Sequence, residues 1–214
     1  MEDSTTKEKV LKRIRNALIN RSANPFPDLD MAAEVFEPFY DTPEVVFAQE
    51  FTKAGGKFVF CETQEELISN LEDLIEENDL KPLFCFDKRL FNLLLKSGIP
   101  VTNDRSQAAN MKAAVTFCEF LIARHGSIMV SSRSGPGRRI NIFPEIHIVL
   151  AHTNQMVDDI KQAFKALKEK YQQQMPSMVS LITGPSRTAD IEKTLIMGAH
   201  GPKELYLFLL DDTN

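Results

Sequence analysis

The sequence predicts an α/β fold in three layers, with helices on both faces of a mostly parallel β-sheet. Short apolar runs suited to buried strands alternate with longer segments whose apolar residues recur at helical spacing, an order typical of βαβ units. The chain has 214 residues, of which 43% are hydrophobic and 26% charged. This length and composition suit one large domain with a core of its own.

The N-terminal region, residues 1–41, is predicted to be a helix followed by an extended arm. Residues 4–19 form an amphipathic helix, because Thr5 and Glu8 have the spacing of a capping box. Its apolar face consists of Val10, Leu11, Ile14 and Leu18. The arm is rich in Pro, Asn and Asp but has aromatic residues at Phe26, Phe36, Phe39 and Tyr40. A solvated linker would not keep these rings, so we expect the arm to lie over the main body or over a partner subunit.

Residues 42–214 are predicted to form the α/β domain, whose first half alternates helices with strands. A helix with Pro43 in its first turn ends at Gly55, and the capping box of Thr63 and Glu66 begins the next helix. In order, the predicted elements are helix 43–54, strand 57–61, helix 64–78, strand 83–86, helix 88–97 and strand 99–101.

The second half of the domain repeats this alternation with more loop. The predicted elements are strand 128–132, strand 146–150, helix 153–174, strand 177–183, a short helix at 191–197 and strand 204–210. The long helix places apolar residues on one face: Met156, Ile160, Ala163, Phe164, Leu167 and Tyr171. Strands alternating with helices imply a parallel sheet covered on both faces.

Composition excludes several classes of function. The net charge of −5 argues against nucleic-acid binding, and no apolar run approaches the ~18 residues that would span a bilayer. The first residues lack a signal-peptide pattern, so we expect a soluble, cytoplasmic chain without membrane contact. Cys61, Cys85 and Cys118 are far apart in apolar runs, which predicts buried free thiols. His147 and His152 lack metal-ligand spacing, so we expect no metal and no cofactor in this chain.

The densest group of unusual residues is the stretch ITGPSRTADIEKTLIMGAHGP, residues 182–202. Its first candidate ligand-binding residues are Gly184, Ser186, Arg187, Thr188 and Asp190. They would lie where the carboxyl end of a strand meets a helix N-terminus, a place where α/β sheets bind anions, and Arg187 suits a carboxylate or phosphate. Alternatively, Ser186 or Thr188 caps the helix and Asp190 complements its dipole.

Further candidate ligand-binding residues lie in three turns. His200, between two glycines, could transfer a proton or bind an anion, or simply hold its loop through a backbone carbonyl. Arg138 belongs to a Gly-rich basic loop, RSGPGRR, that could clamp an anion or form a solvated hairpin tip. Gly126 and Ser127, in ARHGS, could reach a crevice or form a structural turn.

Two carboxylates are candidates for acid-base or nucleophilic chemistry. Glu119 and Glu145 stand alone in apolar surroundings, a setting that raises the pKa of a carboxyl group. Neither has an evident partner in the sequence. No catalytic residue follows from residue types alone.

The chain resembles the LUD (lactate utilisation) domain family, of the small lactate-utilisation protein C type (LutC or YkgG-like). The residues that resemble it are the stretch 182–202 together with LIARHGSIMVSS, GRR and FPEIHIVLA. The GPSRTADIE and GAHGP segments are the specific part of the resemblance. At Ala123-Arg124-His125-Gly126-Ser127 the chain departs from the family, which commonly has an acidic residue where Arg124 stands, so a ligand bound there would differ in charge.

The resemblance implies a fold similar to the NagB, RpiA and CoA-transferase-like superfamily. It also implies a cytoplasmic role in oxidising L-lactate to pyruvate with iron-sulfur partner subunits, which would hold the clusters. It assigns no catalytic residue to this chain, so the sequence leaves open whether the chain is itself an enzyme, and a homo-oligomer also remains open.

Two other functions remain open. One is a stand-alone enzyme acting on an acyl-CoA or a phosphosugar, with Glu119 or Glu145 near Arg187 and Arg138. The other is an interaction module without a small-molecule site.

Overall fold

The computed structural model describes residues 5–19, 25–30, 36–133, 140, 142–191, 194–198 and 200–212. For 108–110, 188–191 and 194–197 it describes the backbone alone. The chain divides into two compact units, Met1–Pro38 and Phe39–Asn214.

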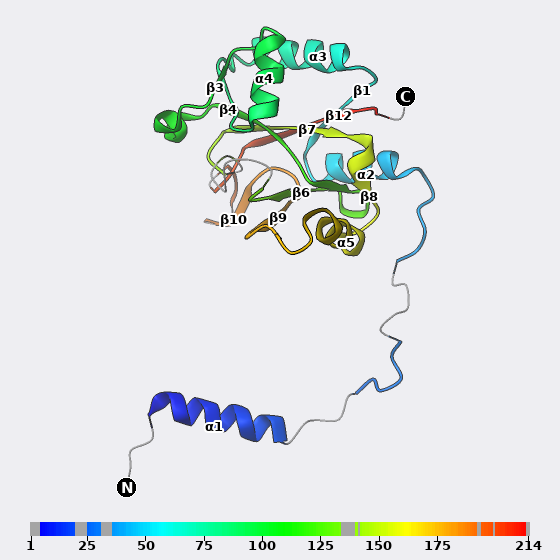
Figure 1. The fold of residues 1–214 in the computed structure, drawn as a ribbon, viewed down its shortest axis with the longest axis vertical. Coiled ribbons are helices and arrows are strands. Elements are labelled where there is room, and N and C mark those ends of the chain that lie inside the picture. Colours follow the sequence, from blue (N-terminus) through cyan, green and yellow to red (C-terminus); the bar gives the residue numbers. More distant parts are fainter. Residues whose placement is uncertain are drawn as a thin grey trace. The chain divides into compact units, whose positions relative to one another are not determined.

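The first unit contains one helix, α1 (Thr6–Ile19), shown in blue in Figure 1. The backbone N–H of Thr5 donates to Glu8 Oε2 at 2.8 Å, and that of Glu8 donates to Thr5 Oγ1 at 3.3 Å. This reciprocal pair is the predicted capping box. None of the residues of α1 is buried.

The second unit contains the remaining elements (Figure 1). Its helices are α2 (Pro43–Lys53), α3 (Gln64–Glu77), α4 (Lys88–Lys96) and α5 (Ile160–Tyr171), with short 3-10 turns η1 (Arg105–Asn110), η2 (Ala123–His125) and η3 (Thr153–Gln155). Its strands are β1 (Lys57–Cys61), β2 (Leu83–Phe84), β3 (Val101–Thr102), β4 (Ala113–Phe117), β5 (Phe120–Ile122), β6 (Ser127–Ser131), β7 (Ile146–His152), β8 (Met156–Val157), β9 (Val179–Ile182), β10 (Arg187–Ile191), β11 (Thr194–Met197) and β12 (Glu204–Leu210).

The central sheet has six strands in the order β1-β12-β7-β4-β2-β3, and all neighbouring strands are parallel. β12 and β7 pair over seven residues in its middle. Five consecutive residues of each, from Leu205 and from His147 onward, are buried, as expected for strands covered on both faces.

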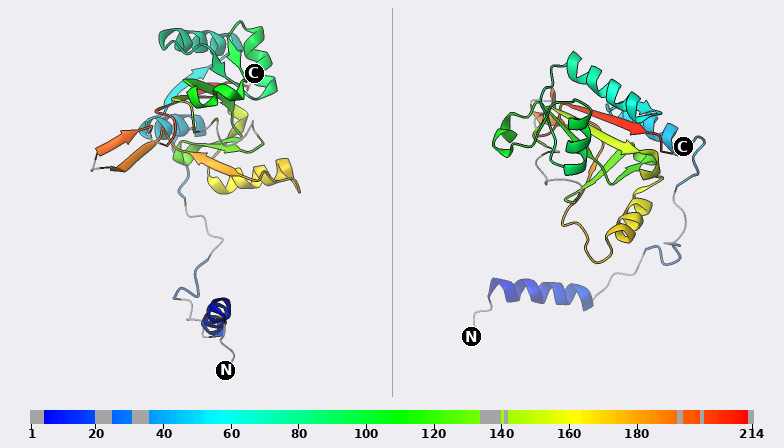
Figure 2. Two further views of the ribbon diagram at one scale, coloured as in Figure 1. Left: turned by 90° about the vertical axis from the view of Figure 1, so that its left-hand side faces the viewer. Right: turned by 45° about the horizontal axis from the view of Figure 1, so that its top comes forward.

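A second sheet of four strands has the order β8-β5-β6-β9 and is mostly antiparallel. Apolar side chains of α3 and α4 pack on one face of the central sheet, whereas α2 and the second sheet cover the other. α5 covers the outer face of the second sheet (Figure 2). Helices therefore flank a mostly parallel central sheet, which confirms the predicted fold class. The sequence prediction did not include the second sheet.

The predicted short helix at 191–197 is wrong. β10 and β11 form an antiparallel hairpin there, which extends away from the two larger sheets in Figure 2 (orange). The β-branched residues Thr188, Ile191, Thr194 and Ile196 favour strand over helix, and a helix this short has little cooperativity to oppose them.

The predicted helix at 153–174 starts too early. Met156 lies in β8, which pairs with β5, and the helix begins only at Ile160. The side chain of Asp159 accepts from the backbone N–H of Gln162 at 2.8 Å and so caps the N-terminus of α5. Phe164 is 38% exposed, so the buried face of α5 is narrower than the sequence suggests.

Candidate functional site

The first half of the 182–202 stretch packs against the C-terminal end of α2. Gly184 has φ +74°, and a Cβ at this position would collide with the carbonyl oxygen of Ala54. The Arg187 guanidinium donates a hydrogen bond to the same carbonyl oxygen. This places a cation at the negative end of the α2 dipole and satisfies a carbonyl that the helix leaves unpaired.

Arg187 therefore contacts the end of α2 and does not lie beside a helix N-terminus. Arg187 is the first residue of β10, so it begins a strand of the hairpin and does not precede a helix N-terminus as the sequence predicted. The free helix amides that were expected to bind an anion are therefore not formed by β10 and β11. Thr188 and Asp190 lie in β10, where the backbone alone is described. Arg138 lies outside the described residues.

The two glycine-rich turns of the stretch are joined to each other. The backbone N–H of Ser186 donates to the carbonyl of Pro202 at 2.8 Å, and the N–H of Gly198 donates to the carbonyl of Ser186 at 2.9 Å. A Cβ on Gly201 would lie 3.0 Å from the Cβ of Ser186. The close approach of these backbones explains why the segment is rich in glycine.

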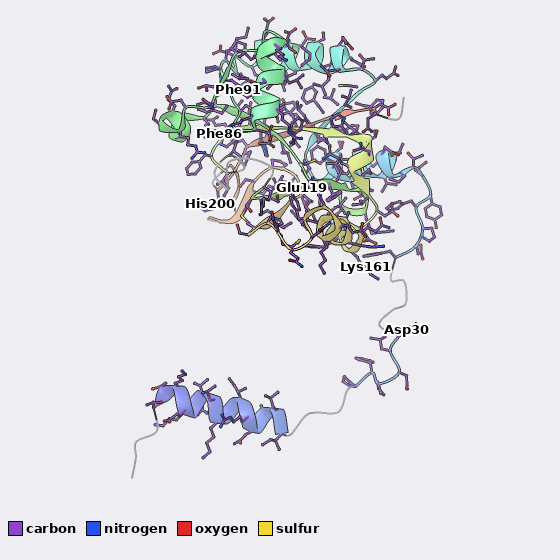
Figure 3. All side chains as sticks on the ribbon, viewed as in Figure 1. Asp30, Phe86, Phe91, Glu119, Lys161 and His200 are labelled. Carbon is purple, nitrogen blue, oxygen red and sulfur yellow. The ribbon has the colours of Figure 1, made fainter. Side chains whose placement is uncertain are left out.

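A cavity of about 320 Å³ adjoins these turns at the amino ends of β7 and β12. Its lining residues are Ile142, Phe143, Pro144, Glu145, Gly198, His200, Gly201 and Lys203. Lys203 Nζ lies 3.2 Å from Glu145 Oε2, and His200, labelled in Figure 3, is exposed at the cavity. A cation and an imidazole beside apolar side chains can bind a small organic anion. Of the candidate residues named from the sequence, the structure brings His200 and Glu145 to this cavity, together with Lys203.

Gly126 and Ser127 lie where α2, β6 and the end of β9 pack together. Gly126 has φ +55° and follows η2, and a Cβ there would collide with the backbone N of Phe51 in α2. Ser127 is buried in β6, and its hydroxyl lies 2.8 Å from that of Thr183, which follows β9. Arg124 stacks 4.4 Å from the ring centroid of Phe39, so the residue that departs from the family pattern contacts an aromatic ring of the domain's first segment.

Glu119, labelled in Figure 3, is buried, and its carboxylate accepts three hydrogen bonds. The donors are Ser131 Oγ at 2.5 Å, Lys170 Nζ at 2.7 Å and Tyr171 Oη at 2.8 Å. Burial alone would raise the pKa of the Glu119 carboxyl, but these hydrogen bonds outweigh it and hold the pKa below its ordinary value. The expectation of a lone carboxylate with a raised pKa is therefore wrong for Glu119.

His147 is a second buried polar group, on β7. Its Nε2 lies 2.9 Å from the hydroxyl oxygen of Thr116, and burial lowers its pKa to about 4, so the ring is neutral at pH 7. Its Nδ1 has no hydrogen-bond partner in the part of the chain that the structure describes. Burial also raises the pKa of the Cys85 and Cys118 thiols to about 12, and both are free cysteines.

The described residues offer neither a metal site nor a membrane-spanning helix. Among them, no group of three or more His, Cys, Asp or Glu side chains is placed to hold a metal ion. No helix in those same ranges is long and apolar enough to cross a bilayer.

The fold and the cavity define an α/β protein with two stacked sheets and a small pocket, lined by apolar and charged side chains, at the amino edge of the central sheet. The family model of the LUD domain matches residues 45–210, and the chain belongs to the LUD domain family. A crystal structure of a DUF162 family protein from Deinococcus radiodurans has a similar fold. Its TM-score is 0.58 at 15% sequence identity, over 78% of this chain and 96% of that one.

Three curated relatives illustrate the sequence similarity. Lactate utilization protein C of Geobacillus sp. (strain WCH70) is 32% identical over 172 residues, which cover 70% of each chain. Lactate utilization protein C of Shouchella clausii is 25% identical over 160 residues, 69% of this chain and 70% of that one. The uncharacterized protein YkgG of Escherichia coli K12 is 33% identical over 109 residues, 50% of this chain and 47% of the relative. The matches thus span about half to 70% of the length of these relatives.

Proposed function

We propose that this protein acts in the utilisation of L-lactate, as a cytoplasmic subunit that works with iron-sulfur partner subunits in the oxidation of L-lactate to pyruvate. The observation that supports this most is membership of the LUD family, together with similarity to relatives named lactate utilization protein C. The oxidation removes two electrons and two protons from lactate, so the complex needs an electron acceptor.

The cysteines of this chain are poorly suited to bind an iron-sulfur cluster, which supports an electron acceptor in a partner subunit. All three are buried at separate places, and burial raises the pKa of each thiol, whereas metal and cluster ligands must be thiolates. This supports the proposal that the iron-sulfur clusters of the complex belong to other subunits.

The cavity at the amino edge of the central sheet is the proposed binding site for the organic anion. Lys203 supplies the positive charge for a carboxylate, and the imidazole of His200 supplies a hydrogen bond. Phe143 offers an apolar wall for the methyl group of lactate. Arg187 is not assigned to this role, because it is not among the residues that line the cavity and its guanidinium donates to the carbonyl oxygen of Ala54.

Purification of the natively expressed, tagged full chain tests this function. We expect cysteine-rich iron-sulfur proteins to copurify and the assembly to form pyruvate from L-lactate. His200→Ala and Lys203→Ala should lower that activity while the thermal midpoint of unfolding stays within a few degrees of the unaltered chain. Recovery of the chain alone, with normal growth of a deletion strain on L-lactate, would refute the proposal.

A second candidate function is a stand-alone transferase or isomerase acting on an acyl-CoA or a phosphosugar. It is favoured by Glu145, an exposed carboxylate that lines the same cavity as His200 and Lys203. Turnover of such a substrate by the purified chain without any partner, lost in Glu145→Gln, would favour this function over the first.

A further inference from the structure

An apolar groove lies on the second unit, between α2, β1 and the end of β12. Its volume is about 480 Å³, and its lining residues are Glu44, Val45, Ala48, Phe58, Phe60, Thr153 and Asp211. Val45 and Phe60 are each 44% exposed, so two large apolar side chains that line the groove are open to solvent. Such a surface is typical of a docking site.

The charged side chains that line this groove are both acidic. Glu44 comes from the first turn of α2, and Asp211 follows β12. The Asp211 carboxylate also accepts from the hydroxyl of Thr153 at 3.4 Å, which fixes it at the rim. The groove therefore combines an apolar floor with a negative rim, and its complement is an apolar ridge flanked by cations.

Helix α1 has this complementary character. Its apolar face is exposed, with Val10 at 50%, Leu11 at 42%, Ile14 at 50% and Leu18 at 60%. At 100° per residue, Arg13 and Arg15 fall on the two sides of this face. The whole chain has a net charge of −5, of which α1 contributes +4, so the other residues carry −9.

We propose that the groove of one copy of this chain receives α1 of a second copy, and that the exchange is reciprocal, forming a two-fold dimer. The aliphatic face of α1 covers Val45 and Phe60, while Arg13 and Arg15 approach the acidic rim. Helix-in-groove docking of this kind uses apolar residues at i, i+4 and i+8, here Val10, Ile14 and Leu18. The inference is independent of the proposed role in lactate utilisation.

Covering α1 along its whole length in both contacts would give the area of a stable dimer. A helix of 14 residues is about 21 Å long and 10 Å wide, so a surface that covers one side of it along this length removes roughly 400 Å² of accessible surface from each partner. Two reciprocal contacts then bury about 1,600 Å² in total, the size of a standard stable interface. One contact alone would reach about half of this.

The chain between the two surfaces is long enough for the exchange. Residues 20–42 separate the end of α1 from the start of α2, and an extended segment of this length spans at most about 75 Å. Exchange of a terminal element between identical chains is a common route to dimers.

Light scattering on the full chain tests the proposal. The unaltered protein should have a mass near twice 24.2 kDa at micromolar concentration and should dissociate more readily in 0.5 M salt. Ile14→Asp should raise the dimer dissociation constant roughly a hundredfold or more, since each of two contacts loses a buried side chain worth a factor of about ten or more. The matched control Asn16→Asp adds the same charge to the opposite side of α1 and should leave the dimer intact.

Mixing two defective chains shows whether a helix of one copy occupies the groove of another. Val45→Lys alters the groove at an exposed position of α2 and should also give monomers. A mixture of the Ile14→Asp and Val45→Lys chains retains one intact contact, because both substitutions fall in the other contact. The mixture should therefore form a heterodimer that is weaker than the unaltered dimer but tighter than either altered chain forms alone. The proposal is overturned if the unaltered chain is monomeric, if both substitutions leave a dimer unchanged, if the mixture stays monomeric, or if α1 instead binds phosphatidylglycerol vesicles in an Ile14-dependent way.

Discussion

Glu119 provides the sharpest test of how the second sheet and α5 are held together. Its carboxylate accepts from Ser131 of β6 and from Lys170 and Tyr171 of α5. Replacement by Ala removes the acceptor for all three donors. Lys170 is 49% exposed and can return to water, whereas the buried Ser131 loses the carboxylate to which its hydroxyl donates. The loss of a buried hydrogen bond and of an ion pair together should lower the free energy of unfolding by about 3 kcal/mol.

Equilibrium unfolding in urea measures this change, with the free energy extrapolated to water at pH 7. Glu119→Gln keeps the shape of the side chain but faces an amide N–H₂ toward donors, so we expect a loss of about 2 kcal/mol. The matched control is Glu145→Gln, which removes an ion pair whose two side chains are 60% and 54% exposed. This control should change stability by less than about 0.5 kcal/mol. Equal effects of the two Gln substitutions would refute the structural role given to Glu119.

Glycine packing, thiol burial and acid titration each give a further prediction. Gly126→Ala should lower the free energy of unfolding by about 3 kcal/mol, because Gly126 has a positive φ and a Cβ there would collide with Phe51. Gly98 also has a positive φ, +83°, but a Cβ there would meet open space, so Gly98→Ala should lower it by only about 1 kcal/mol in the same urea assay. The Cys118 thiol, with a pKa raised to about 12, should react with a disulfide reagent at pH 8 only at the rate of unfolding, and rapid labelling of the native protein would contradict its burial. The folded-state pKa of Glu119 is lowered from 4.5, so its stabilising effect is present above about pH 4.5 and is lost as the pH falls through the folded-state pKa. The stability difference between the unaltered chain and Glu119→Gln should shrink over that acidic range, and a difference that grows on acidification would show the sign to be wrong.

Most of the central sheet could be predicted from the sequence, because its strands and helices have strong local signals. Residues 57–61 and 204–210 are short apolar runs, and the helix after Thr63 has a capping residue whose side chain accepts from Glu66 in the structure. The hairpin at 187–197 was missed because its apolar residues fit a short helix as well as a strand. The β-branched residues of this segment favour a strand. In the structure, Arg187 pairs with Met197 across the two strands of the hairpin.

The candidate site was harder to predict because its contacts join distant segments. The donors to Glu119 lie 12, 51 and 52 residues further along the sequence, and no sequence pattern near Glu119 predicts which residues they are. Lys203 was overlooked as a site residue although it directly follows the GAHGP segment. Its position, next to a glycine-rich turn and at the start of a predicted strand, was the one sequence feature that could have indicated Lys203 as a site residue.

We propose that this chain is needed for the oxidation of L-lactate to pyruvate. The most direct test of this proposal is the rate of pyruvate formation from L-lactate in extracts of a strain that lacks the gene, before and after addition of the purified full chain. We expect the deletion to abolish pyruvate formation and the purified chain to restore it. An unchanged rate in the deletion extract would contradict the claim.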